Sequence, residues 1–547
     1  NQNFEGTKER IKKMFNKVDL SVSSYDTAWV AMVPSPNSSK DPFFPECVNW
    51  LLANQLHNGS WGPKFNPLLI KDALLSTLAC ILALRRWSVG KEQITKGLHF
   101  IESNLASATD EEQQSPVGFN IIFPAMIESA MNFDMHLPLG APTLDALFHR
   151  RDFELKRGYG SNSEGWRTFL AYISGLGSQD WELVMKYQKK NGSLFNSPST
   201  TAAAFTQLKN ADCLKYLRAL LEKCGNAVPT VYPLDNYACL SMVASLESLG
   251  IDRHFREEIR SVLDETYRCW QQGEEDIFSD AATCAMAFRL LRVHGYDISA
   301  VNFQKIVSSI PLGGYMKDIG AALELFKASE IIIHPDESVL EKQNNWMSHF
   351  LKQELSNILT QARRLNKHIG LELDDALKFP FYASLGRLSS RRAIKSYNTE
   401  RTRILKSSYS CLNIGNEDFL KLAVEDFNSC QSIELNHLAS RWVVENRLDK
   451  LKFSRQRQAY CYFSAAANLF PPELSDARMS WAKSGVLTTV VDDFTDVGGS
   501  EEELVNVIQL IEKYVSCSHS LPISIGSICW SAIYACAPSF VFLALRA

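Results

Sequence analysis

The chain has 547 residues, of which 46% are hydrophobic and 22% charged, and its formal net charge is −4. This balance is ordinary for a globular protein of about three or four domains. It provides no basic surface for nucleic acid or for an anionic membrane. The thirteen cysteines contain no Cys-x-x-Cys pair and no zinc spacing. These counts argue against a disulfide framework or a zinc site, and they predict reduced, mostly buried thiols.

Helical periodicity dominates the chain. Apolar residues recur at three- and four-residue spacing in segments such as Ala73–Trp87, Leu98–Leu105 and Ala285–Val293. Gly250 and Gly295 follow such segments, and glycine is the residue that most often ends a helix in a left-handed conformation. Alternating strand patterns are scarce. The sequence therefore predicts an all-α fold.

A turn sequence occurs twice. Gln55–Gly62 and Gln188–Phe195 share the form Gln-x-x-Asn-Gly-Ser followed by a bulky apolar residue. Asn-Gly supplies a tight turn because both residues tolerate positive φ. Helical stretches follow each turn, at 68–87 and 199–208. A repeated turn-plus-helix unit favours a double ring of helices, although two unrelated Asn-Gly turns would give the same pattern.

The stretch Trp481–Ser500 places an apolar helical run before three carboxylates, Asp492, Asp493 and Asp496, and then a Gly-Gly break. On an α-helix Asp492 and Asp496 share one face, while Asp493 lies about 100° away from Asp492. Carboxylates crowded at this spacing require a cation. Their oxygens suit Mg²⁺, which usually bridges one or two carboxylates to substrate phosphates. We therefore predict a Mg²⁺-diphosphate site, with a solvated helix end as the alternative.

Six stretches carry motifs of one enzyme family: Ser24–Ala31, the two Gln…Gly-Ser turns, Gly250–Phe255, Ala285–Arg292 and Asp492–Asp496. By these motifs the chain, from about Asn3 to about Tyr514, resembles the plant ent-kaurene synthases and kaurene-synthase-like diterpene synthases. The resemblance implies the γβα terpene synthase architecture, with two α-barrel domains and a class I α-helical domain. The implied boundaries are 1–27 with 229–405 for the β domain, 28–228 for the inserted γ domain, and 406–547 for the α domain.

The resemblance also distinguishes two classes of diterpene cyclase. Class II members carry Asp-x-Asp-Asp just before Met-Ala-Phe-Arg-Leu-Leu-Arg, where this chain has Asp280-Ala281-Ala282-Thr283. Ala282 and Thr283 replace the acids that would protonate a double bond, so class II activity is not expected. Class I activity is implied instead: Mg²⁺-dependent ionisation and cyclisation of ent-copalyl diphosphate, or a stereoisomer, to an ent-kaurene-type olefin plus diphosphate. Such an enzyme would serve gibberellin or related diterpenoid biosynthesis.

Five residues receive roles from this resemblance. Asp492 and Asp496 of the Asp-Asp-x-x-Asp motif would hold Mg²⁺, with Asp493 as a supporting ligand or as an acceptor behind the ligands. Arg455 and Arg457 would bind the diphosphate, because a guanidinium forks onto two phosphate oxygens. The alternative for the arginines is a solvated basic surface. Aromatic residues within 460–463 would either line a carbocation pocket or belong to the core.

A second acidic pair, Asp374-Asp375, lacks a third acid at helical spacing and is interpreted as structural. Family members carry a second Mg²⁺ motif far downstream, and none is found before Ala547. The stretch Leu521–Leu545 contains no charged residue, but Pro522 and Pro538 argue against a regular membrane span. We therefore expect an incomplete α domain with an aberrant apolar tail at 521–547, which would leave an apolar patch exposed.

Two hypotheses of function follow. The first is a class I diterpene synthase, and the second is a catalytically inactive, truncated family member that at most binds or dimerises. The expected partner is a small prenyl diphosphate, with no nucleic acid and no stable membrane span, and a homodimer is left open. The resemblance implies the plastid stroma, although this chain shows no transit peptide. Because it begins at Asn1 rather than Met, we expect an N-terminal segment to have been removed.

Overall fold

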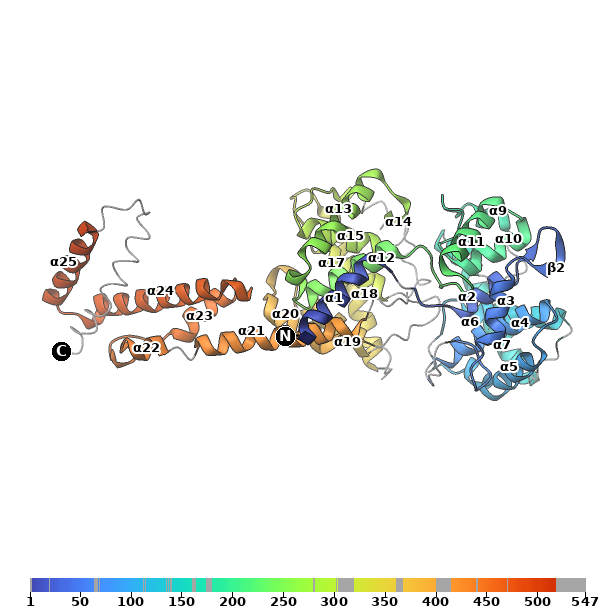
Figure 1. The fold of residues 1–547 in the computed structure, drawn as a ribbon, viewed down its shortest axis with the longest axis horizontal. Helices are drawn as coiled ribbons and strands as arrows, with labels where there is room; N and C mark the ends of the chain where they lie inside the picture. The colour runs from blue at the N-terminus through green and yellow to red at the C-terminus, as the bar shows by residue number, and fades with distance from the viewer. Residues whose placement is uncertain are drawn as a thin grey trace. The chain divides into compact units, whose positions relative to one another are not determined.

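Helices make up almost all of the regular structure in the computed structural model of the chain (Figure 1). The ranges that the structure describes are 2–18, 20–62, 67, 69–111, 113, 115–133, 135, 137, 140–159, 164–173, 180–278, 281–301, 303, 319–360, 367–399, 415–438, 441–469 and 471–517. Within these ranges the strands form one small antiparallel sheet, in which β1 (Pro34–Ser35) pairs with β2 (Ser38–Pro42). The predicted all-α fold is confirmed.

The chain divides into two units. The first comprises Asn1–Ser248, Asp252–Ala383 and Lys395–Leu420, and the second comprises Leu249–Ile251, Ser384–Ile394 and Lys421–Ala547. The division into γ, β and α domains stays a prediction, and its boundary at 406 and the tail at 521–547 lie outside the described residues.

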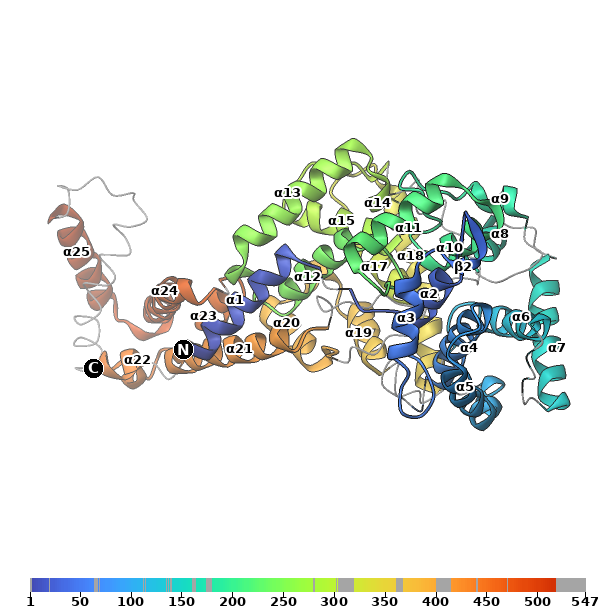
Figure 2. The same cartoon turned by 45° about the vertical axis from the view of Figure 1, so that its right-hand side comes forward.

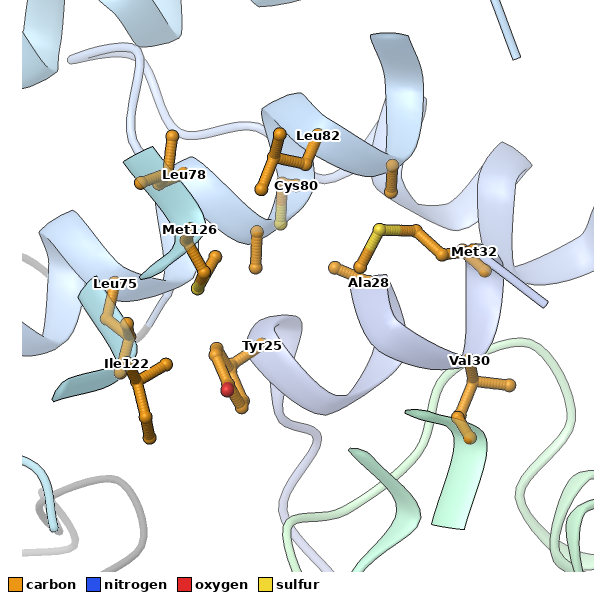
Figure 3. Close-up of a cluster of buried hydrophobic side chains, with 14 of the residues drawn as sticks. Tyr25, Ala28, Val30, Met32, Leu75, Leu78, Cys80, Leu82, Ile122 and Met126 are labelled. Carbon is orange, nitrogen blue, oxygen red and sulfur yellow. The ribbon is translucent and has the colours of Figure 1, made fainter. Parts of the chain in front are cut away.

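The first half of the first unit has its own hydrophobic core, whose buried members all lie between Tyr25 and Val228. At its centre α2 (Ser24–Ala31) is buried on nearly every side, although Ser24, Asp26 and Thr27 are polar. Tyr25 and Ala28 face side chains of α4 and α6 (Figure 3). The other helices are α3 (Pro45–Ala53), α4 (Ile70–Arg86), α5 (Lys91–Asn104), α6 (Phe119–Asn132), α7 (Ala141–Tyr159), α8 (Glu164–Tyr172), α9 (Trp181–Met185), α10 (Pro198–Leu208) and α11 (Ala211–Cys224), with the 3₁₀ turn η1 (Leu105–Ala108).

The two Asn-Gly turns are built alike. Gly59 and Gly192 have φ values of +87° and +88°. The side-chain amide of Gln55 donates to Gly59 O at 2.9 Å, and that of Gln188 donates to Gly192 O at 3.0 Å. In each turn the next bulky residue, Trp61 or Leu194, is fully buried, and its backbone N–H donates to a threonine hydroxyl of the following helix. The repeat is therefore a structural one.

The ends of the segment that contains this core lie together. The backbone N–H of Ser23 donates to Val228 O at 2.8 Å, and Val22 forms an isolated antiparallel bridge with Pro229. Asp26 is buried beside this junction, where it accepts from the Ser23 hydroxyl at 2.6 Å and from the backbone N–H of Ser199 at 3.2 Å. The polar network thus joins α2 to the start of α10.

The remaining helices of the first unit include α15 (Ala281–Val293), which is buried along nearly its whole length and contacts α12, α13, α14 and α17. Helix α15 packs against α12 and α17, and α17 packs against α18 (Figure 2). Near the end of α15, the buried Arg292 donates to Ile331 O and to Glu337. These helices are α12 (Asp235–Ser248), α13 (Arg256–Gln272), α14 (Glu275–Phe278), α17 (Ile319–Ser329), α18 (Ser338–Thr360) and α19 (Lys367–Lys378), with η2 (Asp252–His254) and η4 (Phe381–Ala383).

Helix α1 (Gln2–Asn16) packs against residues far along the chain. The ring of Phe4 meets that of His254 edge-on at 5.5 Å, and Phe15 lies 6.4 Å from Phe255. Arg10 forms an ion pair with Asp418 at 2.7 Å. The first helix of the chain therefore has its partners beyond residue 250.

The second unit contains the acidic motif. Helix α23 packs against α24, and α24 continues directly into a single π-helical turn, η7 (Figure 1). The elements are α20 (Gly386–Ser396), α21 (Glu417–Leu438), α22 (Arg441–Glu445), η5 (Leu448–Lys450), α23 (Gln458–Ala466), η6 (Pro472–Leu474), α24 (Ser475–Asp493), η7 (Phe494–Gly498) and α25 (Glu501–Cys517).

Two absences concern the described ranges alone. Across them, none of the helices combines the length and the apolar character that crossing a bilayer requires. Nine cysteines of the described ranges are free thiols and seven of these are buried, as the sequence predicts.

Candidate active site

The acidic motif stands where an α-helix changes into a π-turn. Helix α24 ends at Asp493, and the backbone N–H of Gly499 donates to Phe494 O, five residues earlier, at 2.8 Å. Asp492 therefore lies on the α-helix and Asp496 within the π-turn. The α-helix that the sequence predicts therefore changes into a wider turn after Asp493, and the expectation that Asp492 and Asp496 share one face stays a prediction. Both side chains are exposed.

Aromatic packing explains why the helix changes here. Phe494 is buried, and its ring lies 5.5 Å from that of Phe453. A Cβ on Gly498 would come within 2.6 Å of Phe453, and one on Gly499 within 2.8 Å of Phe494. The Gly-Gly pair leaves room for the two rings, so the turn can close over them.

Arg455 contacts both adjacent aspartates. It lies in the segment between η5 and α23, and its backbone N–H and its Nε donate to the two oxygens of Asp493 at 2.7 Å each. Its Nη2 donates to Oδ2 of Asp492 at 3.0 Å. Asp493 is buried, whereas the side chains of Arg455 and Asp492 are 49% and 57% exposed. Arg455 is thus fixed against the acidic end of α24.

These hydrogen bonds keep Asp493 ionised. The backbone N–H of Arg455, followed by its guanidinium, holds the pKa of Asp493 below its ordinary value, against the burial that would raise it. Because Arg455 bonds both oxygens, Asp493 fits the role of an acceptor behind the ligands better than that of a ligand itself.

Arg457 lies nearby and is exposed. It occupies the N-cap position of α23, with its guanidinium 5.9 Å from the centre of the Tyr460 ring. In α23 the side chains of Tyr460 and Phe463 are 67% and 59% exposed, while Tyr462 is buried. The stretch 460–463 therefore divides between the surface and the core, since a helix presents residues three apart on one face and those between them on others.

The carboxylates of Asp492 and Asp496 suit a hard cation that needs few ligands from the protein. Across the described ranges no three or more His, Cys, Asp or Glu side chains converge closely enough to hold a metal. Mg²⁺ does not require such a cage, because one or two carboxylates with waters and substrate phosphates complete its shell. Exposed Asp492 and Asp496 supply that number of oxygen ligands. The donor chemistry therefore fits Mg²⁺.

The position corresponding to the class II acids is apolar. Ala282 and Thr283 are buried in α15, with 6% and 3% of their surface exposed, and Asp280 lies outside the described residues. In the other acidic pair, Asp374 forms an ion pair with Lys378 one turn along α19, at 2.7 Å. That contact matches the structural interpretation of the pair.

Comparison with known proteins identifies the family. The model of the terpene synthase N-terminal domain matches residues 180–373, and that of the terpene synthase family metal-binding domain matches residues 444–540. Ent-kaurene synthase-like 1 of Ricinus communis is 61% identical over 510 residues, 92% of this chain and 69% of the relative. The chain belongs to the terpene synthase family. Terpene synthases are lyases, and Asp492, Asp493 and Asp496 all fall within the range matched by the metal-binding domain.

Other members of the family support the same assignment. Ent-kaur-16-ene synthase of Cucurbita maxima, named chloroplastic, is 60% identical over 93% of this chain and 66% of its own length. Abietadiene synthase from Abies grandis superimposes with a TM-score of 0.82 at 33% identity, over 98% of this chain and 73% of that one. Ent-copalyl diphosphate synthase from Arabidopsis thaliana gives the same TM-score at 29% identity, over 99% and 80%. The chain spans about two thirds of the length of the curated relatives it matches.

Part of this site escaped sequence reasoning. The backbone N–H of Arg455 donates to Asp493, and a backbone donor cannot be inferred from the type of residue. Phe453 and Phe494 are some forty residues apart in the sequence, so their contact could not be inferred either. One signal was present in the sequence: the pair Gly498-Gly499, shortly after Phe494 and the three acids, marks a place where a side chain can approach the backbone closely.

Proposed function

We propose that the chain is a class I diterpene synthase. It would ionise ent-copalyl diphosphate, or a stereoisomer, and cyclise the cation to an ent-kaurene-type olefin, releasing diphosphate. One observation carries this proposal. The half-exposed guanidinium of Arg455 donates a hydrogen bond to the exposed carboxylate of Asp492, beside the turn that contains Asp496. Cation ligands next to an anion-binding arginine suit a diphosphate leaving group. The names of the relatives point to the same reaction.

The residues divide the work by their chemistry. Asp492 and Asp496 would hold Mg²⁺, which when bound stabilises the negative charge that develops on the departing diphosphate. Arg455 and Arg457 would bind the diphosphate oxygens and orient the allylic C–O bond for cleavage. Tyr460 and Phe463 would shield the carbocation, since the faces of aromatic rings attract cations. These assignments remain proposals.

The residues Ala282 and Thr283, which replace the class II acids, indicate that another enzyme acts on the substrate first. Neither side chain can donate a proton to an unactivated alkene, so the substrate must already carry its first rings when it reaches this protein. We place the protein after a class II cyclase, in gibberellin or related diterpenoid biosynthesis. A plastid location would follow from the relatives named chloroplastic. Self-association stays a prediction.

The direct test is product analysis with purified protein. Incubation with ent-copalyl diphosphate and Mg²⁺ should yield a tetracyclic olefin detectable by gas chromatography and mass spectrometry. Asp492→Ala should lower turnover by at least about a hundredfold while leaving the melting temperature nearly unchanged, because its side chain is exposed. Full activity in Asp492→Ala would show that the acids are only a solvated helix end. Absence of product in the wild type would favour a protein that merely binds.

The class assignment gives a separate prediction. Geranylgeranyl diphosphate should not be converted to any copalyl diphosphate by the wild-type chain, because the protonating acids are replaced by Ala282 and Thr283. Dephosphorylated reaction mixtures can be searched for copalol. Its detection would contradict the assignment, whatever the result with ent-copalyl diphosphate.

A further inference from the structure

Arg455 binds its two aspartates in different ways. Its contact with Asp493 is multiple and shielded: the backbone N–H and Nε donate to the two carboxylate oxygens at 2.7 Å, Nη2 lies 2.7 Å from Oδ1, and Asp493 is 7% exposed. Its contact with Asp492 is a single hydrogen bond of 3.0 Å from Nη2, and that carboxylate is 57% exposed. A bidentate, buried, charge-assisted pair is strong, and a single exposed one is weak. The first contact is therefore a fixed attachment and the second an exchangeable one.

The exchangeable contact occupies an oxygen of a proposed metal ligand. Nη2 of Arg455 lies on Oδ2 of Asp492, where a cation bound by that carboxylate would have to compete with it. The guanidinium carries the same sign of charge as the metal, so it partly neutralises Asp492 in the metal's place. A metal ion that takes over Asp492 frees Nη2 from that carboxylate, while Asp493, which also contacts Nη2 at 2.7 Å, keeps the guanidinium in position.

We infer that Asp493 is a positioning residue for Arg455, and that Nη2 of Arg455 exchanges between Asp492 and a diphosphate oxygen as the metal binds. This inference rests on the proposed function of the site. Arg455 then opposes metal binding before diphosphate arrives and supports diphosphate binding once the metal is present. By linkage, metal and diphosphate each strengthen the binding of the other through this side chain.

Because Arg455 should oppose the binding of metal alone and support the binding of diphosphate, removing its side chain should change the two affinities in opposite directions. We would measure Mg²⁺ binding to the full chain by calorimetry without diphosphate, and then the binding of inorganic diphosphate supplied as its Mg²⁺ complex. Arg455→Ala should tighten binding of Mg²⁺ alone by about threefold or more. It should weaken binding of the diphosphate complex by about tenfold or more, the value of a hydrogen bond to a charged group.

A matched control distinguishes the exchange of the Arg455 contact from a general effect of removing one positive charge. Lys452→Ala removes a positive charge from an exposed residue of the same segment, one for which no contact with either aspartate is seen. It should change both affinities by no more than about twofold, because exposed charges at a distance are screened. If Lys452→Ala reproduces the two shifts of Arg455→Ala, the effect is general electrostatics and the inference is overturned.

Asp493 variants test the positioning role. Asp493→Asn keeps the size of the side chain but cannot accept both bonds from Arg455. It should weaken diphosphate binding as much as Arg455→Ala does, with no further loss in the double variant Arg455→Ala/Asp493→Asn. Asp493→Glu, which retains two acceptors, should recover part of the affinity. A purely structural role would instead lower the melting temperature and reduce both affinities together, which would refute the inference.

The outcomes distinguish this inference from the proposed function. If the wild type binds both probes and forms product, but Arg455→Ala shifts both affinities in the same direction, the exchange is wrong and the class I function stands. If the wild type binds neither Mg²⁺ nor the diphosphate complex, both fail.

Discussion

A buried ion pair shows how a single residue can govern stability in this chain. The side chains of Arg292 and Glu337 are 1% and 8% exposed, and Glu337 also accepts from the backbone N–H groups of Ile333 and His334. Burial would raise the pKa of Glu337, but these donors, with Arg292 foremost, lower it to about 2. The pair joins the end of α15 to the segment that precedes α18.

We predict that Glu337→Gln lowers the free energy of unfolding at pH 7 by about 3 kcal/mol, because it leaves a buried guanidinium without its counterion. A depressed carboxyl pKa stabilises the fold fully above its ordinary value of 4.5. That stabilisation is lost as the pH falls from 4.5 toward 2. The gap between wild type and variant in urea unfolding should therefore be constant from pH 7 to 5 and narrow below 4.5.

The exposed pair of Glu92 and Lys96 provides the control. Its side chains are 74% and 56% exposed, and the two residues lie four apart on α5. Glu92→Gln should leave the free energy of unfolding nearly unchanged, because an exposed ion pair contributes little to stability. An equal loss in both variants would show that burial is not the cause.

At the scale of elements, the close packing around the glycines of the two Asn-Gly turns can be tested by comparison with Gly273, which has no close neighbours. A Cβ on Gly192 would lie 2.2 Å from Asp212 O, and one on Gly59 would lie 2.4 Å from Lys96 O. Gly273 also has positive φ, +66°, but a Cβ there would meet nothing within 4 Å.

We predict that Gly273→Ala costs about 1 kcal/mol of unfolding free energy, from backbone strain alone. Gly192→Ala and Gly59→Ala should each cost about 3 kcal/mol or more, because a backbone carbonyl of α11 or of α5, the second helix after each turn, must also move. The free energies come from denaturant unfolding of the three variants. Equal costs at all three positions would mean that α5 and α11 are not held against the two turns.

Local features of these elements could be predicted from the sequence, and features that depend on distant contacts could not. The Asn-Gly turns, the capping Ser23 and the terminating Gly250 and Gly295 follow from the conformational preferences of the residues themselves. The π-turn does not, since it depends on Phe453 packing under Phe494. The family resemblance predicts that Arg455 binds diphosphate. Its attachment to Asp493 could not be predicted, because it depends on tertiary folding and on a backbone donor.

At the scale of the whole molecule, the segment 22–229 has the properties of an inserted domain. Its core is its own, and its two ends are hydrogen-bonded to each other. A segment of this kind can fold without the chain on either side.

We predict that residues 22–229 produced alone unfold in one cooperative transition, measured by circular dichroism during thermal denaturation. A fragment of equal length, residues 126–333, divides the core that α2 and α4 build and should show no such transition. If the 22–229 fragment also unfolds gradually, its stability depends on residues outside it, and the assignment of an inserted γ domain loses its main support.

The position of α1 has a consequence for synthesis on the ribosome. Phe4 and Phe15 contact His254 and Phe255, about 240 residues later in the chain. At about 5–20 residues per second, α1 leaves the exit tunnel on the order of 10–50 s before these partners exist. During that interval its apolar face has no native site, while the whole segment 22–229 is made and can fold. A nascent chain of this protein should therefore present α1 to trigger-type chaperones, and residues after 255 should end that association.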